Sequence, residues 1–172
     1  VRGRTRAVEQ QAFESALDQA VLGEELGYGS VWCVEHHFTR GFSHASAPDL
    51  FLAAIAARTR RIRLGLGVVL LPFNHPIRTA ERVGTLDVLS NGRVEFGTGR
   101  GASPIEYQAF MQPFELSRSL WEDSLAAVLE IWEADGEPVD IEHERWLVPN
   151  VSVYPRPVQE PHPPLIIPGA AS

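Results

Sequence analysis

The stretch IRLGLGVVLLPFNHPIRTAERVGTLDVLSNGRVEFGTG, residues 62–99, decides the fold class. Its apolar run over 62–71 has no polar face, which predicts a strand buried on both sides of a sheet. Pro76 then begins an amphipathic helix, because proline fits the first helical turn, and the turn at 90–92 ends it. A second strand follows over 93–97. Strand, helix and strand in this order predict a parallel βαβ unit.

The same alternation continues on both sides of this unit. Further helices are predicted over 10–26, 47–59 and 121–132, and further strands over 30–34 and 165–167. This pattern indicates an α/β protein with a parallel sheet, either doubly wound or a (β/α)8 barrel. Four strands and four helices are half of what a barrel needs. The acidic stretch 133–144 is interpreted as a solvated loop, and the proline-rich stretch 149–164 as a connector.

Length and composition exclude several classes of protein. The chain has 172 residues, 44% of them hydrophobic, and a net charge of −7. This composition is ordinary for a globular domain and argues against nucleic acid as the main partner. We find no apolar run long enough for a membrane span and expect no secretion signal. The single cysteine, Cys33, fits a reducing compartment, so we expect a cytoplasmic protein with one domain over 1–172.

Polar residues and small residues follow every predicted strand at its carboxyl end. They are Glu35, His36 and His37 after the first strand, Asn74 and His75 after the second, Arg100 after the third, and Gly169, Ala170 and Ser172 after the fourth. The carboxyl ends of parallel strands meet at one edge, where α/β folds build their active sites. The sequence therefore predicts a functional site at this edge.

The two adjacent imidazoles suggest either a metal site or acid/base chemistry. Neighbouring side chains on a strand point to opposite faces, so only one of His36 and His37 can enter a common site. The metal-binding spacings H-E-x-x-H and H-x-H are also absent. We therefore expect no metal. One inward histidine is suited to proton transfer near neutral pH, and a structural histidine is an equal alternative.

The glycine-rich segment GTGRG, residues 97–101, is a weaker signal. Its backbone amides can approach an anion, and Arg100 can hold a phosphate by two hydrogen bonds. The spacing matches neither a Walker P-loop nor G-x-G-x-x-G, so a tightly turning loop is an equal alternative. Gly67, which precedes two valines, similarly indicates either close approach of a flat ligand ring or tight packing.

Three segments together resemble the bacterial-luciferase-like, flavin-dependent monooxygenases. They are VWCVEHHF (31–38), LLPFNHPIRTAERVGTLDVLSNGRVEFGTGRG (70–101) and PLIIPGAAS (164–172), and the likeness runs over about residues 10–172. Its specificity comes from the ordered set E-H-H-F, H-P-x-R-x-A-E, L-D-x-L-S-x-G-R and F-G-x-x-R-G. The resemblance implies a (β/α)8 TIM barrel of luciferase-like type. The chain would hold about half of it, strands 2–5 with their helices, as a fragment that lacks the first strand and the C-terminal half.

The resemblance also implies catalytic roles. His36 corresponds to the family's active-site histidine, with Glu35 and His37 in support. Gly67 and Val68 fall where the family places a non-proline cis peptide against the isoalloxazine ring.

The flavin phosphate site is implied in the same way. Its residues would be Arg100, Gly169, Ala170 and Ser172. Two departures from luciferase itself are visible: Gly99 replaces a reactive cysteine, and Gly169-Ala170 replaces a Glu-Ser pair. These departures imply a member of the wider group rather than a light emitter.

The implied reaction is a flavin-dependent monooxygenation. Reduced FMN from a separate flavin reductase would react with O₂ to a C4a-peroxyflavin, which would oxygenate a small organic substrate. One alternative is an F420-dependent hydride-transfer oxidoreductase on the same fold, and another is a non-catalytic, truncated fragment. A homo-oligomer is expected. The substrate is not indicated, because the loops that select it include those after later strands.

Overall fold

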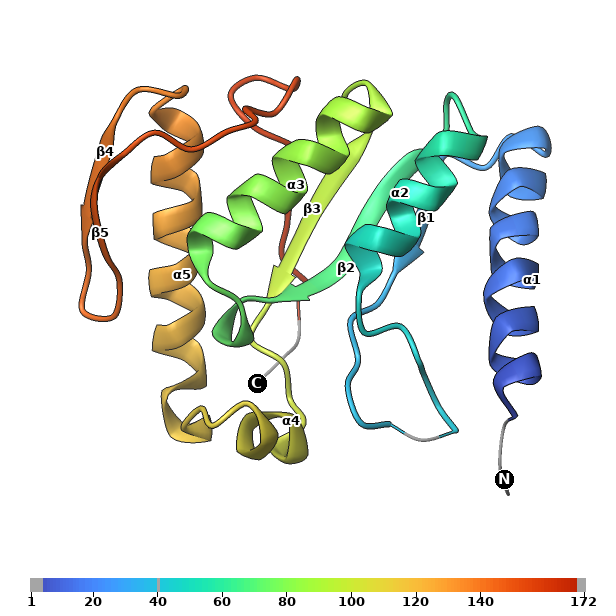
Figure 1. Cartoon of the computed structure of the whole chain (residues 1–172), viewed down its shortest axis with the longest axis horizontal. Helices are drawn as coiled ribbons and strands as arrows, with labels where there is room; N and C mark the ends of the chain where they lie inside the picture. The colour runs from blue at the N-terminus through green and yellow to red at the C-terminus, as the bar shows by residue number, and fades with distance from the viewer. Residues whose placement is uncertain (1–4, 40, 170–172) are drawn as a thin grey trace.

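The computed structural model describes residues 5–39 and 41–169, which form a parallel four-stranded sheet with helices packed against it. The strands are β1 (Ser30–Cys33), β2 (Arg63–Leu70), β3 (Val94–Gly99) and β6 (Leu165–Ile166). Their order in space is β1-β2-β3-β6, and each pairing is parallel (Figure 1). The parallel α/β fold predicted from the sequence is confirmed.

Helices connect the strands in the predicted alternation. They are α1 (Arg6–Glu25), α2 (Pro48–Arg58), α3 (Pro76–Ser90), α4 (Pro104–Ala109) and α5 (Ser117–Glu133), with 3-10 turns η1 (Leu71–Phe73) and η2 (Phe114–Leu116). α2, α3 and α4 each begin with a proline, which needs no hydrogen-bond partner at the first helical position. No helix within the described ranges is long and apolar enough to cross a membrane.

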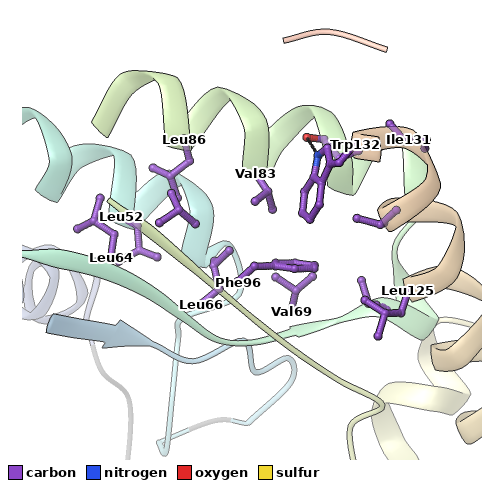
Figure 2. Close-up of a cluster of buried hydrophobic side chains, with 14 of the residues drawn as sticks. Leu52, Leu64, Leu66, Val69, Val83, Leu86, Phe96, Leu125, Ile131 and Trp132 are labelled. Atoms are coloured by element: carbon purple, nitrogen blue, oxygen red, sulfur yellow. Dashed lines mark hydrogen bonds between the residues drawn. The ribbon is translucent and has the colours of Figure 1, made fainter. Parts of the chain in front are cut away.

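The main core lies between one face of the sheet and helices α2, α3 and α5. Alternate strand residues supply its floor, namely Leu64, Leu66, Val94 and Phe96, all of which are inaccessible to solvent. Figure 2 shows the side chains of Leu64, Leu66 and Phe96 facing those of the helices, namely Leu52 of α2, Val83 and Leu86 of α3, and Trp132 of α5. The rings of Phe96 and Trp132 meet edge to face with centroids 5.1 Å apart. Each fully buried Leu or Phe contributes roughly 1.5–3 kcal/mol, so this layer holds the sheet in place.

The opposite face of the sheet carries a large aromatic side chain against glycines. Trp32 of β1 is the register partner of Gly65 on β2 and is 43% exposed. A Cβ added at Gly65 would lie 2.2 Å from the indole, and one added at Gly67 would lie 3.2 Å from it. Close packing therefore accounts for glycine at position 65.

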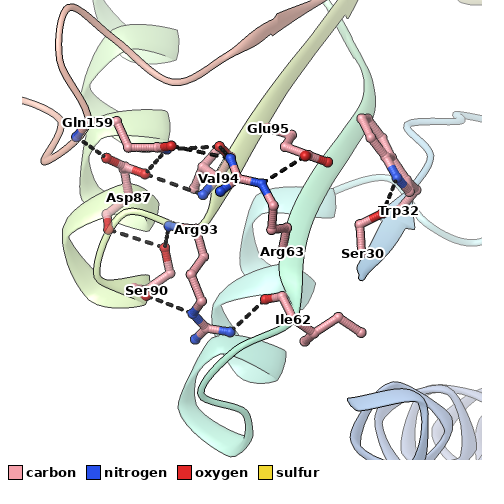
Figure 3. A network of polar contacts seen from close by, with 10 residues as sticks. All are labelled: Ser30, Trp32, Ile62, Arg63, Asp87, Ser90, Arg93, Val94, Glu95 and Gln159. Atoms are coloured by element: carbon pink, nitrogen blue, oxygen red, sulfur yellow. Dashed lines mark hydrogen bonds and ion pairs between the residues drawn. The ribbon is translucent and has the colours of Figure 1, made fainter. Parts of the chain in front are cut away.

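The amino-terminal edge of the sheet is closed by the buried guanidinium of Arg93. Its Nη1 donates to the hydroxyl of Thr59 and to the carbonyl of Ile62, both at 2.9 Å, and its Nε donates to the carbonyl of Ser90 at 2.7 Å (Figure 3). Its Nη2 donates to two further carbonyl groups. One side chain thus joins the ends of α2 and α3 to the start of two strands.

Asp87 performs a similar task for the segment that leads to β6. Its Oδ2 accepts the backbone amides of Val158 at 2.8 Å and Gln159 at 3.0 Å (Figure 3). Asp87 and Arg93 both belong to the L-D-x-L-S-x-G-R motif. This part of the motif therefore acts at the edge of the sheet remote from the predicted site.

The segment between α5 and β6 differs from the prediction. It contains an antiparallel hairpin of β4 (Val139–Glu142) and β5 (Leu147–Val151), which packs beside α5 (Figure 1). The interpretation of 133–144 as a solvated loop is therefore wrong, and the stretch 149–164 begins inside β5. Ile141 and Val148 are buried in the core, and that burial fixes the hairpin.

Candidate functional site

The segment after β1 directs successive side chains into two different hollows. Glu35 and His37 line a cavity of about 150 Å³ bounded by residues of β2, α2 and α3. His36 lines a separate hollow of about 290 Å³ formed by the loop that follows it. His36 and His37 thus face different hollows, as predicted, although both lie beyond the end of β1 at Cys33.

The carboxylate of Glu35 is buried and accepts three hydrogen bonds. Oε2 accepts the backbone amide of Leu70 at 3.0 Å, and Oε1 lies 3.1 Å from Nε2 of His37. The side-chain amide of Asn74 donates to Oε1 at 3.4 Å. A buried carboxylate with several donors is held in one place, so Glu35 ties the end of β1 to the end of β2.

His37 is held on the same side as Glu35. Its backbone amide donates to Oε1 of Glu106, a buried residue of α4, at 2.8 Å. Its ring packs edge-on against Phe110 with centroids 4.9 Å apart. These contacts occupy the imidazole with structural partners.

His36 has a different environment. Its backbone amide donates to the carbonyl of Ala45 at 2.9 Å, and its ring meets Phe42 edge to face at 5.5 Å. Its ring nitrogens bond no side chain or backbone group within 5–39 and 41–169. A partly exposed imidazole with no protein partner can exchange a proton with a bound molecule.

The neighbouring strand contributes an irregular backbone. A cis peptide joins Gly67 to Val68, at the position where the family resemblance implies one. The register between β2 and β3 shifts between Leu66 and Val69, so two β2 residues stand opposite one β3 residue. Such a bulge redirects the strand next to the predicted site.

Arg100 follows β3 with an exposed side chain. Its Nη1 donates to the hydroxyl of Ser117, at the start of α5, at 3.0 Å. Its carbonyl accepts the hydroxyl of Tyr107, whose pKa is raised by burial. The remaining guanidinium N–H groups suit a phosphate, and this donor set fits the phosphate of a flavin.

The last predicted strand end is described only in part. Gly169 is exposed, and a Cβ added to it would meet no atom within 4 Å. Ala170 and Ser172 lie outside the described residues. Within those same bounds, no three His, Cys, Asp or Glu side chains lie close enough together to hold a metal ion.

Sequence reasoning missed some residues around Glu35. Arg82 and Asp49 line the same cavity as Glu35, and Glu106 bonds the backbone beside it. Asn74 gave a signal, since it follows a strand, whereas Glu106 lies on a helix of six residues that no periodicity could predict.

The fold and the strand ends define a parallel α/β protein with its candidate site at the carboxyl edge of the sheet. The chain belongs to the luciferase-like monooxygenase family, whose model matches residues 1–172. It is 32% identical over 160 residues to the oxygenase component of flavin-dependent trigonelline monooxygenase from Acinetobacter baylyi. The matched region covers 91% of this chain and 43% of that relative. The chain therefore spans less than half the length of this relative.

Solved structures agree on the fold. The crystal structure of monooxygenase RslO1 from Streptomyces bottropensis superposes with a TM-score of 0.88 at 39% identity, over 92% of this chain and 47% of its own. The oxygenating constituent of 3,6-diketocamphane monooxygenase from Pseudomonas putida, in complex with FMN, superposes with a TM-score of 0.83 at 24% identity. The match covers 96% of this chain and 47% of that one. An F420-dependent secondary alcohol dehydrogenase superposes with a TM-score of 0.79 at 21% identity, over 91% of this chain and 48% of its own. The last two likenesses show the fold alone.

Proposed function

We propose that the chain is part of a flavin-dependent monooxygenase that uses reduced FMN and O₂ to oxygenate a small organic substrate. The observation that carries the proposal is the separation of His36 from Glu35 and His37, which leaves one imidazole in its own hollow with no hydrogen-bond partner for its ring among residues 5–39 and 41–169. When bound, the reduced flavin supplies two electrons that activate O₂ as a C4a-peroxyflavin. One oxygen atom then enters the substrate, and the other leaves as water.

The proposed roles follow the positions of the residues. His36 holds or transfers a proton, while Glu35 and His37 support the segment that carries it. The backbone of Gly67 and Val68 lies against the flavin ring. The phosphate is held by Arg100, Gly169, Ala170 and Ser172. Phe38 lines the hollow of His36, and the ring of Phe42 packs edge to face against the imidazole, so apolar surface adjoins the proposed proton-transfer group.

The proposed partner is a separate flavin reductase, because the relative from Acinetobacter baylyi is named an oxygenase component. Residues 1–172 form part of a luciferase-like barrel domain in this proposal, and the complete protein is a cytoplasmic homo-oligomer. The F420-dependent alternative is tested alongside FMN, because an F420-dependent alcohol dehydrogenase shares the fold.

Anaerobic titration of the full-length protein with reduced FMN and with reduced F420 tests the cofactor. We expect FMN to bind and, on mixing with O₂, to be reoxidised at a rate different from that of free FMN. Binding of F420 alone supports hydride transfer instead. Binding of neither cofactor supports the non-catalytic alternative and overturns the proposal.

Two substitutions test the residue roles. We expect His36→Ala to lower turnover while leaving FMN affinity mostly intact, with His143→Ala on the remote hairpin as the control. Arg100→Ala is expected to weaken FMN binding by about 10- to 150-fold, since a charged hydrogen bond contributes roughly 1.5–3 kcal/mol. Arg78→Ala on the exposed face of α3 is the matched control. Unchanged turnover removes His36 from the site, and unchanged affinity removes Arg100.

A further inference from the structure

A chain of polar contacts runs from helix α2 to the residues on either side of His36. Arg82 of α3 donates from Nη2 to Oδ1 of Asn74 at 2.7 Å, and its Nε lies 3.5 Å from a carboxylate oxygen of Asp49. Asn74 in turn donates to Oε1 of Glu35, the oxygen that also bonds His37. The chain therefore joins α2, α3, the turn that precedes α3, and the segment that follows β1.

The orientation of the Asn74 amide is fixed by this arrangement. Its nitrogen donates to the carbonyl of Leu70 at 2.9 Å as well as to Glu35, and its oxygen accepts from Arg82. Both faces of the amide are thus committed, and a flipped amide would place donors against donors. Asn74 can hold Glu35 in only one position while Arg82 is in place.

Packing alone does not hold Glu35 and His37. The cavity of about 150 Å³ adjoins both side chains, so they have room to move if their hydrogen bonds are lost. His36 lies between them in the chain and points to the other hollow. Glu35 and His37 face one hollow and His36 faces the other, so holding residues 35 and 37 limits the directions open to the side chain between them.

We propose that Asn74 and Arg82 are positioning residues for His36, which act by holding Glu35 and His37 on the helix side of the segment. The inference rests on the proposed function for the role of His36, and it gives a role to Asn74, which follows a predicted strand, and to Arg82, which lies outside the predicted site. Neither residue needs to touch flavin or substrate. Their effect on the reaction passes through the orientation of one imidazole.

The first test measures the imidazole itself without cofactor. Histidine ring NMR of the full-length protein is expected to give one sharp His36 signal. In Asn74→Ala and Arg82→Met this signal should broaden or split, because residue 36 gains a second orientation. Arg78→Met, on the same helix but exposed, should leave it unchanged. Arg82→Lys, which restores a donor, should return most of the sharp signal. An unchanged His36 signal in both Asn74→Ala and Arg82→Met overturns the inference.

The second test is a double-mutant cycle on the release of hydrogen peroxide from reduced FMN and O₂. We expect Asn74→Ala to change the rate about 10-fold in the native background and less than about 2-fold in the His36→Ala background, as for residues that act as a unit. An equal loss in both backgrounds would show a role in stability only and overturn the inference. Arg82→Met provides the same cycle if Asn74→Ala does not fold.

The two proposals fail separately. If His36→Ala leaves the peroxide rate unchanged, the proposed role of His36 is lost, yet the ring signal still reports whether Asn74 and Arg82 orient it. If His36→Ala alters the peroxide rate but the His36 ring signal is unchanged in Asn74→Ala and Arg82→Met, only the positioning inference is lost.

Discussion

The indole of Trp32 occupies the space in which residue 65 would carry a side chain. A Cβ at Gly65 would lie 2.2 Å from Cδ2 of the ring, well inside van der Waals contact. The indole is also anchored at its other end, where Nε1 donates to the hydroxyl of Ser30 at 3.0 Å. The large side chain of Trp32 on β1 therefore requires a residue without a side chain at position 65 on β2.

Gly65→Ala is expected to destabilise the fold by about 1–3 kcal/mol, the usual cost of inserting a methyl group into a packed site. The measurement is the free energy of unfolding in urea. Gly29→Ala is the control, because a Cβ there would meet no atom within 4 Å. Trp32→Ala combined with Gly65→Ala should recover part of the loss. Equal stability of the Gly65 and Gly29 variants would contradict the steric account.

Arg93→Met is expected to destabilise the protein by about 3 kcal/mol or more, because it leaves buried carbonyl groups without a donor. Burial lowers the pKa of Arg93 from its ordinary value, so the five hydrogen bonds compensate a real desolvation cost. Thermal unfolding measures the effect. The exposed Arg78→Met should change stability by less than about 0.5 kcal/mol. A comparable, small effect of both substitutions would show that the Arg93 network contributes little.

Glu24 should make stability depend on pH in the acid range. Its carboxylate accepts the backbone amides of Ile62, Arg61 and Arg60 at 2.6–3.0 Å, and chiefly the Ile62 bond lowers its pKa from 4.5 to about 2. A carboxyl group with a lowered pKa stabilises the fold fully above the unfolded value. This contribution is therefore lost as pH falls from about 4.5 to about 2.

Urea unfolding between pH 7 and pH 2 measures this dependence. Glu24→Gln should be less stable than the native protein at pH 7, and the difference should shrink towards pH 2. Glu25→Gln, at the exposed neighbouring position, is the control. A stability difference for Glu24→Gln that does not vary with pH would rule out the assigned linkage.

Cys33 is expected to be inert in the folded protein. Burial, with a smaller contribution from Asp49, raises the pKa of its thiol to about 11. The thiolate is the reactive form, so alkylation by iodoacetamide at pH 8 should be about 100-fold slower in native protein than in urea. Mass spectrometry over time measures the rate. Similar rates in both states would mean that the β1 edge opens readily.

The sequence predicted the parallel core well because its signals are local and strong. Pro48 and Pro76 mark helix starts, and the run of β2 is apolar on both faces. The opposite directions of His36 and His37 were also predicted from strand alternation, although both residues lie beyond the end of β1 at Cys33. Both conclusions need only spacing and periodicity, which a single sequence contains.

The hairpin of β4 and β5 was missed although its pattern is present. Ile141 is buried between the exposed residues Asp140 and Glu142, which is the alternation of a half-buried strand. The acidic composition obscured it, and Pro149 argued against a strand. A proline is tolerated there because β5 pairs with β4 alone within the described residues.

The contacts that organise the site were less accessible to prediction. The bond from Glu106 to the backbone of His37 spans 69 positions, and the bond from Leu70 to Glu35 spans 35. Such contacts depend on how loops converge, which no local pattern records. The cis peptide at Gly67 was implied only by the resemblance to a family, because the residues themselves indicated no more than close approach of a ligand ring or tight packing.

Residues 35–37 face the two hollows in turn, so the site depends on the length of the chain between β1 and His36. We expect insertion or deletion of one residue between Cys33 and His36 to turn the carboxylate towards the loop hollow and the imidazole of His36 towards the helices. A change of two residues is expected to restore the directions. An odd change of length before His36 would therefore exchange a reactive group for a structural one without altering any residue type.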